Sequence, residues 1–182
     1  MQLYYLPGRG GCLETGLGEA LTARGLAVSG RETVGDFARL SFQEQIELVA
    51  QDLKTGFWHE DSRVIANSYG AYLFLHAQTL LPAYVGKVLL LSPIVGEFSS
   101  GETATHFLPP RSRQLMKLAQ EGKYPVAKHC ELYVGERDWQ SNPKSVTALA
   151  KLTGWNVTVV KGAGHMLPKE YVGAVLEGWF TK

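Results

Sequence analysis

Short apolar runs alternate with amphipathic segments along the whole chain, and this alternation limits the folds that the sequence can adopt. Six runs have the length and aliphatic content of buried strands, and each ends just before a proline, glycine, asparagine or serine: Gln2–Leu6, Leu26–Ser29, Arg63–Ala66, Lys87–Leu91, Glu131–Val134 and Asn156–Lys161. Strands that alternate with helices predict parallel βαβ units, with helices on both faces of one sheet. We therefore expect a three-layer α/β/α sandwich with about six mostly parallel strands.

The segments between these runs have helical spacing and helix-end signals. Ser41 and Glu44 match a capping box, and Asn142 followed by Pro143 is typical of a helix start. Further helical patterns cover Leu13–Arg24, Ala71–Leu81, about Arg111–Gln120, and Pro168–Phe180. We expect a single domain over residues 1–182, with a short cap-like insertion at 93–129.

Composition and charge exclude several classes of protein. The chain has 182 residues, of which 45% are hydrophobic and 19% charged, and these values are typical of a soluble globular domain with one core. The formal net charge is +1 and the basic residues are scattered, so no nucleic-acid partner is indicated. No apolar run approaches the roughly 20 residues of a membrane span, so no membrane partner is expected.

The compartment is inferred from the N-terminus and the cysteines. The chain begins without a cationic lead and reaches Pro7 and Gly8 too early for a secretory signal. Cys12 and Cys130 are far apart in the sequence and are expected to be free thiols. A cytoplasmic location is the expectation, and the oligomeric state is not readable from the sequence.

Polar residues that can carry chemistry follow the predicted strands. Ala66-Asn67-Ser68-Tyr69-Gly70 lies between a strand and a very apolar helix, as a small-x-Ser-x-small turn. Small neighbours allow a sharp turn that presents the Ser68 hydroxyl at a helix N-terminus. Right-handed crossovers bring the carboxyl ends of all parallel strands to one edge, where such sheets carry their sites. Ser68 is therefore a candidate nucleophile.

A histidine and a carboxylate follow the last two strands. His165 comes after Gly162-Ala163-Gly164, a flexible loop that would let the imidazole reach the sheet edge. Asp138 follows the preceding strand, where a carboxylate could accept the second N–H of the imidazole. Glu136 is a rival for that role, and Glu97 is a weaker one. The order along the chain is serine, aspartate, histidine.

The loop after the first strand is rich in glycine and exposes backbone N–H groups. One of them, from Arg9 or Gly10, could join the N–H of Tyr69 in an oxyanion hole. By their positions in the sequence, Trp139, Met166 and Phe107 are expected to wall a rather open substrate pocket.

These motifs, in this order, resemble the α/β-hydrolase superfamily, whose nucleophile elbow is of the G-x-S-x-G type and whose triad runs Ser, Asp or Glu, His. In size the chain looks like its compact, nearly lidless members, such as the small retinoblastoma-binding-protein-type serine hydrolases. The resemblance implies six strands in the order 2-1-3-4-5-6. It also implies a carboxylesterase- or thioesterase-like serine hydrolase that needs no metal or cofactor. Ala66 replaces the first glycine of the elbow, and Pro7-Gly8 replaces the usual His-Gly before the oxyanion loop.

On this hypothesis, His165 takes the proton of Ser68 during attack on a small ester-like substrate, and Asp138 stabilises the imidazolium. Two alternatives stay open. The first is a non-catalytic binding protein that keeps the hydrolase fold. The second is a dinucleotide-binding Rossmann-type protein, suggested by Gly8-x-Gly10, although Leu13 stands where the third glycine belongs.

Overall fold

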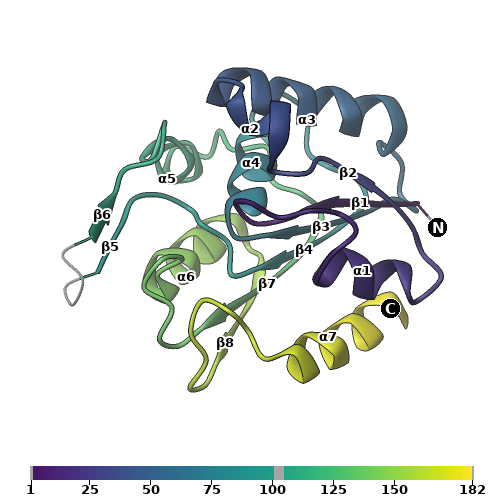
Figure 1. Cartoon of the computed structure of the whole chain (residues 1–182). Helices are drawn as coiled ribbons and strands as arrows, with labels where there is room; N and C mark the ends of the chain where they lie inside the picture. Colours follow the sequence, from purple (N-terminus) through teal and green to yellow (C-terminus); the bar gives the residue numbers. More distant parts are fainter. Residues whose placement is uncertain (1, 101–104, 182) are drawn as a thin grey trace.

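Six parallel strands form the central sheet of the computed structural model, which describes residues 2–100 and 105–181 (Figure 1). They are β1 (Gln2–Leu6), β2 (Ala27–Gly30), β3 (Arg63–Asn67), β4 (Lys87–Leu91), β7 (His129–Gly135) and β8 (Asn156–Val160). Their order is β2-β1-β3-β4-β7-β8, and every neighbouring pair is parallel. The predicted parallel sheet and its strand order are confirmed.

Helices cover both faces of this sheet, so the predicted three-layer architecture is also confirmed (Figure 1). One face packs against α1 (Leu17–Thr22) and α7 (Lys169–Thr181). The other packs against α3 (Phe42–Gly56), α4 (Tyr69–Gln78), α5 (Gln114–Gln120) and α6 (Pro143–Thr153). The short α2 (Gly35–Arg39) precedes α3.

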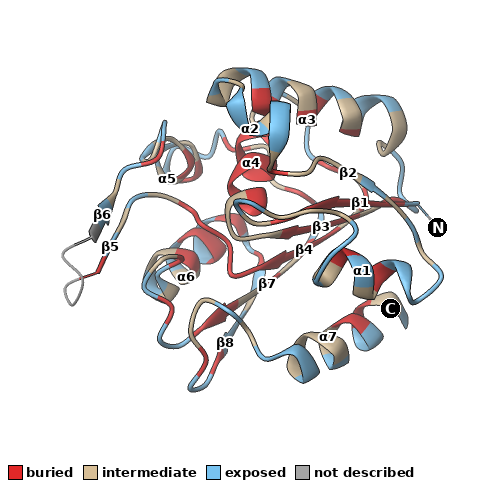
Figure 2. Cartoon of the chain, in the orientation of Figure 1, coloured by how far each residue is buried: buried red, intermediate tan, exposed pale blue. Residues whose placement is uncertain are grey.

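Alternation along each strand divides the buried side chains between two cores. In β1, Leu3 and Tyr5 face α1 and α7, whereas Tyr4 and Leu6 face the larger core around α4. From Gly70 to Gln78 every residue of α4 is buried, and Figure 2 shows this helix among the most buried elements. The nucleophile candidate therefore precedes a helix that is fixed on all sides.

The predicted helix starts at Ser41 and Asn142 are confirmed in atomic detail. Ser41 Oγ accepts a hydrogen bond from Glu44 N–H, and the Glu44 carboxylate accepts one from Ser41 N–H in return. The Asn142 side chain accepts from the N–H groups of Lys144 and Ser145, and Pro143 occupies the first helical position.

The structure differs from the sequence prediction around residue 13. Helix α1 begins at Leu17 instead of Leu13, because the Leu13 N–H donates to Glu32 Oε1 (2.9 Å) and Gly16 has a φ of 58°. Residues 13–16 thus belong to the loop after β1.

The segment 93–129 also differs in part from the prediction. It contains an unpredicted antiparallel hairpin of β5 (Phe98–Ser100) and β6 (Thr105–Phe107), followed by α5, which begins at Gln114 instead of Arg111. Arg111 has a φ of 60°, which is incompatible with helical backbone. The cap-like role of this segment stays a prediction, and residues 101–104 lie outside the described part.

His76 is a fully buried member of α4 that packs beside Tyr72, the residue that bonds the insertion. Its ring packs edge-on against Tyr72 (4.4 Å between centroids) and Phe42 (5.1 Å), and the Tyr72 hydroxyl donates to Pro110 O (2.6 Å). Burial, with the nearby positive charge of Arg111, lowers the pKa of His76 to about 3. His76 is therefore a structural residue, as its place in an apolar helix predicts.

This low pKa predicts a pH-dependent stability. Between the ordinary histidine pKa near 6.5 and the folded value of about 3, the unfolded chain binds a proton that folded His76 rejects. The stability contributed by neutral His76 is complete above about pH 6.5 and falls with decreasing pH by about 1.4 kcal/mol per unit. We expect His76→Leu to lose less unfolding free energy than wild type between pH 6.5 and 4 in urea titrations. Parallel pH curves for the two proteins would contradict this.

Among the described residues, no helix combines the length and the apolar character that crossing a membrane requires.

Candidate active site

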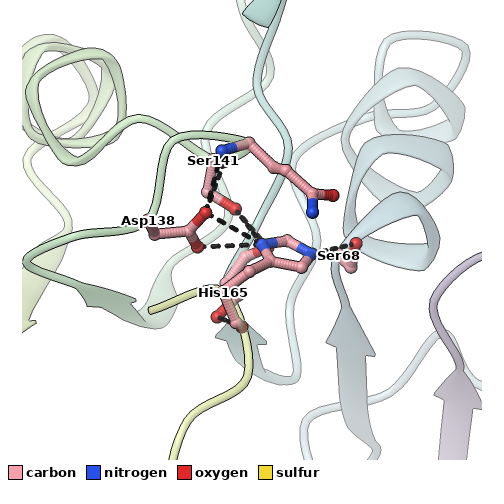
Figure 3. A network of polar contacts seen from close by, with 6 residues as sticks. Ser68, Asp138, Ser141 and His165 are labelled. Carbon is pink, nitrogen blue, oxygen red and sulfur yellow. Dashed lines mark hydrogen bonds and ion pairs between the residues drawn. The ribbon is translucent and has the colours of Figure 1, made fainter. Parts of the chain in front are cut away.

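Three side chains from different strand ends meet at the carboxyl edge of the sheet (Figure 3). Ser68 follows β3, Asp138 follows β7 and His165 follows β8. Ser68 Oγ lies 2.8 Å from His165 Nε2, and His165 Nδ1 lies 2.9 Å from both carboxylate oxygens of Asp138. The three residues that the sequence singled out are in direct contact, across sequence separations of 97 and 27 residues.

The burial of these three side chains indicates which imidazole nitrogen carries the proton. The Asp138 side chain is 0% exposed and that of His165 is 19% exposed. A buried carboxylate beside Nδ1 requires an N–H donor there, so Nδ1 carries the proton and donates to Asp138. In the neutral imidazole Nε2 is then the acceptor, and the Ser68 hydroxyl donates to it. This is the arrangement that allows an imidazole to remove the serine proton.

The competing carboxylates lie elsewhere. Asp138 Oδ1 also accepts hydrogen bonds from the N–H groups of Gln140 (3.0 Å) and Ser141 (2.9 Å), which hold it toward His165. Glu136 is exposed and accepts from the Gly162 N–H (2.8 Å), where it stabilises the histidine loop. Glu97 is exposed before β5. Only Asp138, among these three, is bonded to the imidazole.

The backbone at Ser68 adopts the sharp turn that the small flanking residues predict. Ser68 has φ 52° and ψ −115°, a combination that costs a non-glycine residue on the order of 1–3 kcal/mol. A Cβ on Gly70 would lie 2.2 Å from Leu6 O and 2.4 Å from Pro7 O. Glycine is therefore required at position 70, because it lets the nucleophile turn pack directly on the end of β1.

The end of β1 continues into the proposed oxyanion loop. Gly8 lies so close to the nucleophile that a Cβ on it would be 3.2 Å from Ser68 Cβ. The Gly10 N–H donates to Thr33 O (3.3 Å), so this predicted oxyanion donor is already bonded within the fold. The Arg9 N–H has no hydrogen-bond partner within residues 2–100 and 105–181, and it remains the candidate from this loop. The Tyr69 N–H, at the first position of α4, has no intrahelical acceptor.

Two serines that the sequence analysis missed support the histidine. Ser92, which follows β4 and has a φ of 43°, donates from its hydroxyl to His165 O (2.7 Å). The Ser141 hydroxyl donates to Ser92 O (2.6 Å) and lies 3.4 Å from His165 Nδ1. Ser92 directly follows β4, just as Ser68 directly follows β3. This position after a strand could have identified Ser92 from the sequence.

A second required glycine allows the histidine loop to reach the site. A Cβ on Gly135, at the end of β7, would lie 2.2 Å from Gly164 O and 2.5 Å from Ala163 O. The Arg137 N–H then bonds Ala163 O (2.8 Å). The loop that carries His165 is thereby packed onto the loop that carries Asp138.

Three aromatic side chains link the β5–β6 hairpin to the loop after β7. Phe107 and Trp139 were both predicted to wall the pocket, and both contact Phe98. The ring centroids of Phe98 and Phe107 are 4.9 Å apart, and those of Phe98 and Trp139 are 5.6 Å apart. Met166 is 87% exposed and lies outside this row. The Arg9 guanidinium lies over the rings of Tyr69 (4.7 Å) and Phe107 (5.3 Å), which joins the hairpin to the oxyanion loop. Burial raises the pKa of the Tyr69 phenol, while the charge of Arg9 lowers it.

Side chains of the kinds that bind metals also occur in the turn before β3 and as the two cysteines. His59, Glu60 and Asp61 are exposed in the turn before β3, and His59 Nε2 contacts Gln2 Oε1 (3.0 Å). Within the described ranges, no group of three or more histidine, cysteine or acidic side chains is placed to hold a metal ion. Cys130 is buried, which raises its pKa, and Cys12 is half-buried; both are free thiols.

No protein-family model and no curated protein sequence matches the chain. Solved structures do resemble it over nearly its full length. The ydeN gene product from B. subtilis is 18% identical and superposes with a TM-score of 0.69, over 100% of this chain and 99% of its own. A carboxylesterase from the Thaumarchaeon Nitrososphaera gargenis is 13% identical, with a TM-score of 0.66 over 99% and 89%. A monoacylglycerol lipase from Paleococcus ferrophilus is 16% identical, with a TM-score of 0.61 over 97% and 92%. These likenesses and the strand order agree: the chain has the α/β-hydrolase fold.

Proposed function

We propose that this chain is a serine hydrolase that cleaves a small ester-like substrate through an acyl-enzyme on Ser68. The observation that carries the proposal is the continuous hydrogen-bond chain from the Ser68 hydroxyl through His165 to the buried Asp138 carboxylate. The names of the solved structures, which include a carboxylesterase and a lipase, support hydrolysis as the reaction type.

The chemistry follows from the proton positions. His165 Nε2 removes the proton from Ser68 Oγ as this oxygen bonds to the substrate carbonyl carbon. The protonated imidazole then donates that proton to the leaving oxygen, and the bond between carbonyl carbon and leaving group breaks. A water molecule gives its proton to Nε2, attacks the acyl-enzyme and releases the acid, and Ser68 recovers its proton. Asp138 stays ionised and stabilises the imidazolium in both halves of the reaction.

The negative charge on the carbonyl oxygen needs donors that are fixed in advance. We assign these to the backbone N–H groups of Tyr69 and Arg9, which come from the loop ends of β3 and β1. Each such donor typically contributes about 10²–10³ in rate. The N-terminus of α4 and the exposed Arg9 side chain add positive potential at the same place.

The entrance favours substrates with an apolar group. Phe98, Phe107 and Trp139 form a row that starts at the residue next to Asp138 in the chain, and the exposed Leu108 follows Phe107. Such a surface can hold an acyl or alcohol moiety by burial of apolar area. We therefore expect turnover of short-chain p-nitrophenyl esters, and a panel of graded chain lengths measures how far the surface extends. Absence of turnover across the panel would count against ester hydrolysis.

A fluorophosphonate probe distinguishes the enzyme from a binding protein of the same fold. Wild type should be labelled covalently, with the added mass on the peptide that contains Ser68, because only an activated serine attacks the phosphorus. Ser68→Ala should not be labelled, whereas Ser145→Ala, a serine on α6 outside the site, should be labelled as wild type is. A folded wild-type protein that stays unlabelled would favour the binding protein.

A further inference from the structure

The connection between β2 and α2 lies against the loop that contains Arg9. Thr33 in this connection is 5% exposed, and its hydroxyl donates to Gly8 O and accepts from the Gly11 N–H (3.0 Å). Its backbone adds two bonds: Thr33 O accepts from the Gly10 N–H (3.3 Å), and Thr33 N–H donates to Gly11 O (3.0 Å). Thr33 is thus bonded to the loop on both sides of Arg9.

Thr33 is itself held rigidly by its neighbours in the sequence. The Arg31 guanidinium forms a bidentate ion pair with Asp52 of α3, with N···O distances of 2.6 and 2.8 Å. The Glu32 carboxylate accepts from the Leu13 N–H (2.9 Å), just beyond the glycine-rich loop. Three consecutive residues therefore tie this connection to the body of the protein and to the loop.

We propose that Thr33 is a positioning residue for the hydrolysis. Its hydroxyl fixes the Gly8–Arg9 peptide unit through Gly8 O and the Gly10–Gly11 unit through the Gly11 N–H, so that the Arg9 N–H points at the oxyanion. This inference rests on the proposed function. A hydroxyl suits the task because it can donate to Gly8 O and accept from Gly11 N–H at once. Misplacing a catalytic group by about 1 Å can lower the rate by about 10²-fold.

The test replaces the hydroxyl while keeping the side-chain shape. Thr33→Val keeps both backbone bonds and removes the two side-chain bonds, so we expect kcat for a p-nitrophenyl ester to fall about 10- to 100-fold. The KM should change by less than about threefold, because the lost interaction acts in the transition state. Thr33→Ser keeps the hydroxyl and should restore kcat to within about threefold of wild type. Thr33→Ala, which places no methyl group against Gly8 O, should behave as Thr33→Val does.

A matched control separates positioning from general stability. Thr153 on α6 is also buried, and its hydroxyl donates to Leu149 O (2.9 Å) away from the site, so Thr153→Val should keep the wild-type kcat. A trifluoromethyl ketone, which adds to Ser68 as a tetrahedral oxyanion, should bind Thr33→Val more weakly by the same factor as kcat/KM falls.

The outcomes distinguish this inference from the proposed function. If wild type neither turns over esters nor reacts with fluorophosphonate, the function itself fails. If wild type is active and both Thr33→Val and Thr33→Ala match Thr33→Ser in kcat and ketone affinity, the positioning role fails.

Discussion

Replacing Ser68 by alanine is expected to lower kcat for a p-nitrophenyl ester by roughly 10⁵- to 10⁶-fold. The variant loses the oxygen that bonds to the carbonyl carbon, and His165 loses the hydroxyl that lies 2.8 Å from Nε2. Substrate binding should persist, because the aromatic row and both proposed oxyanion donors remain. The change removes a side-chain hydroxyl at a backbone-strained position and leaves α4 intact, so the fold should be retained.

Circular dichroism and steady-state kinetics together check this expectation. The far-ultraviolet spectrum and thermal midpoint of Ser68→Ala should be close to those of wild type, while the release of p-nitrophenol falls to near the uncatalysed rate. Ser145→Ala serves as the matched serine control and should keep full activity. A folded Ser68→Ala protein with more than about one hundredth of the wild-type kcat would refute the acyl-enzyme on Ser68.

The second large effect is expected for Asp138→Asn, with a loss of about 10⁴-fold in kcat. The amide oxygen should take the Oδ1 position, since the N–H groups of Gln140 and Ser141 require an acceptor there. The amide NH₂ then faces His165 Nδ1 and donates to it. The imidazole proton then lies on Nε2. A protonated Nε2 cannot accept the proton of Ser68.

Glu136→Gln is the matched carboxylate control for that variant. Its side chain accepts from the Gly162 N–H, and an amide oxygen can do the same, so kcat should stay within about threefold of wild type. Both variants should react with fluorophosphonate at rates that parallel their kcat. A loss of activity in Glu136→Gln with a fully active Asp138→Asn would transfer the acid role to Glu136.

The fold was predictable from the sequence because its signals are local. Runs such as Lys87–Leu91 have the length and aliphatic composition of a buried strand, and the capping box at Ser41 marks a helix start without help from distant residues. The positions of Ser68, Asp138 and His165 were predictable for a related reason. In a parallel sheet the carboxyl ends share one edge, so residues that follow strands must be neighbours.

The remaining features depend on contacts between distant segments, which no local pattern reports. Strands β5 and β6 are three residues each and, within residues 2–100 and 105–181, pair only with each other, so they lack a detectable period. Thr33, Ser92 and Ser141 are ordinary small polar residues whose partners are 22 to 73 positions away. Their roles depend on which loops contact each other in the folded chain, and the sequence alone does not report those contacts.

The proposed proton-transfer residues and the proposed oxyanion donor follow strands in different parts of the sheet. The proton-transfer residues follow central and far strands, whereas the Arg9 donor follows β1 and its support at Thr33 follows β2, a four-residue edge strand with one neighbour. Short edge strands are the parts of a sheet that open most readily. If this border opens first while the rest of the domain stays folded, the proposed activity should be lost on heating before global melting.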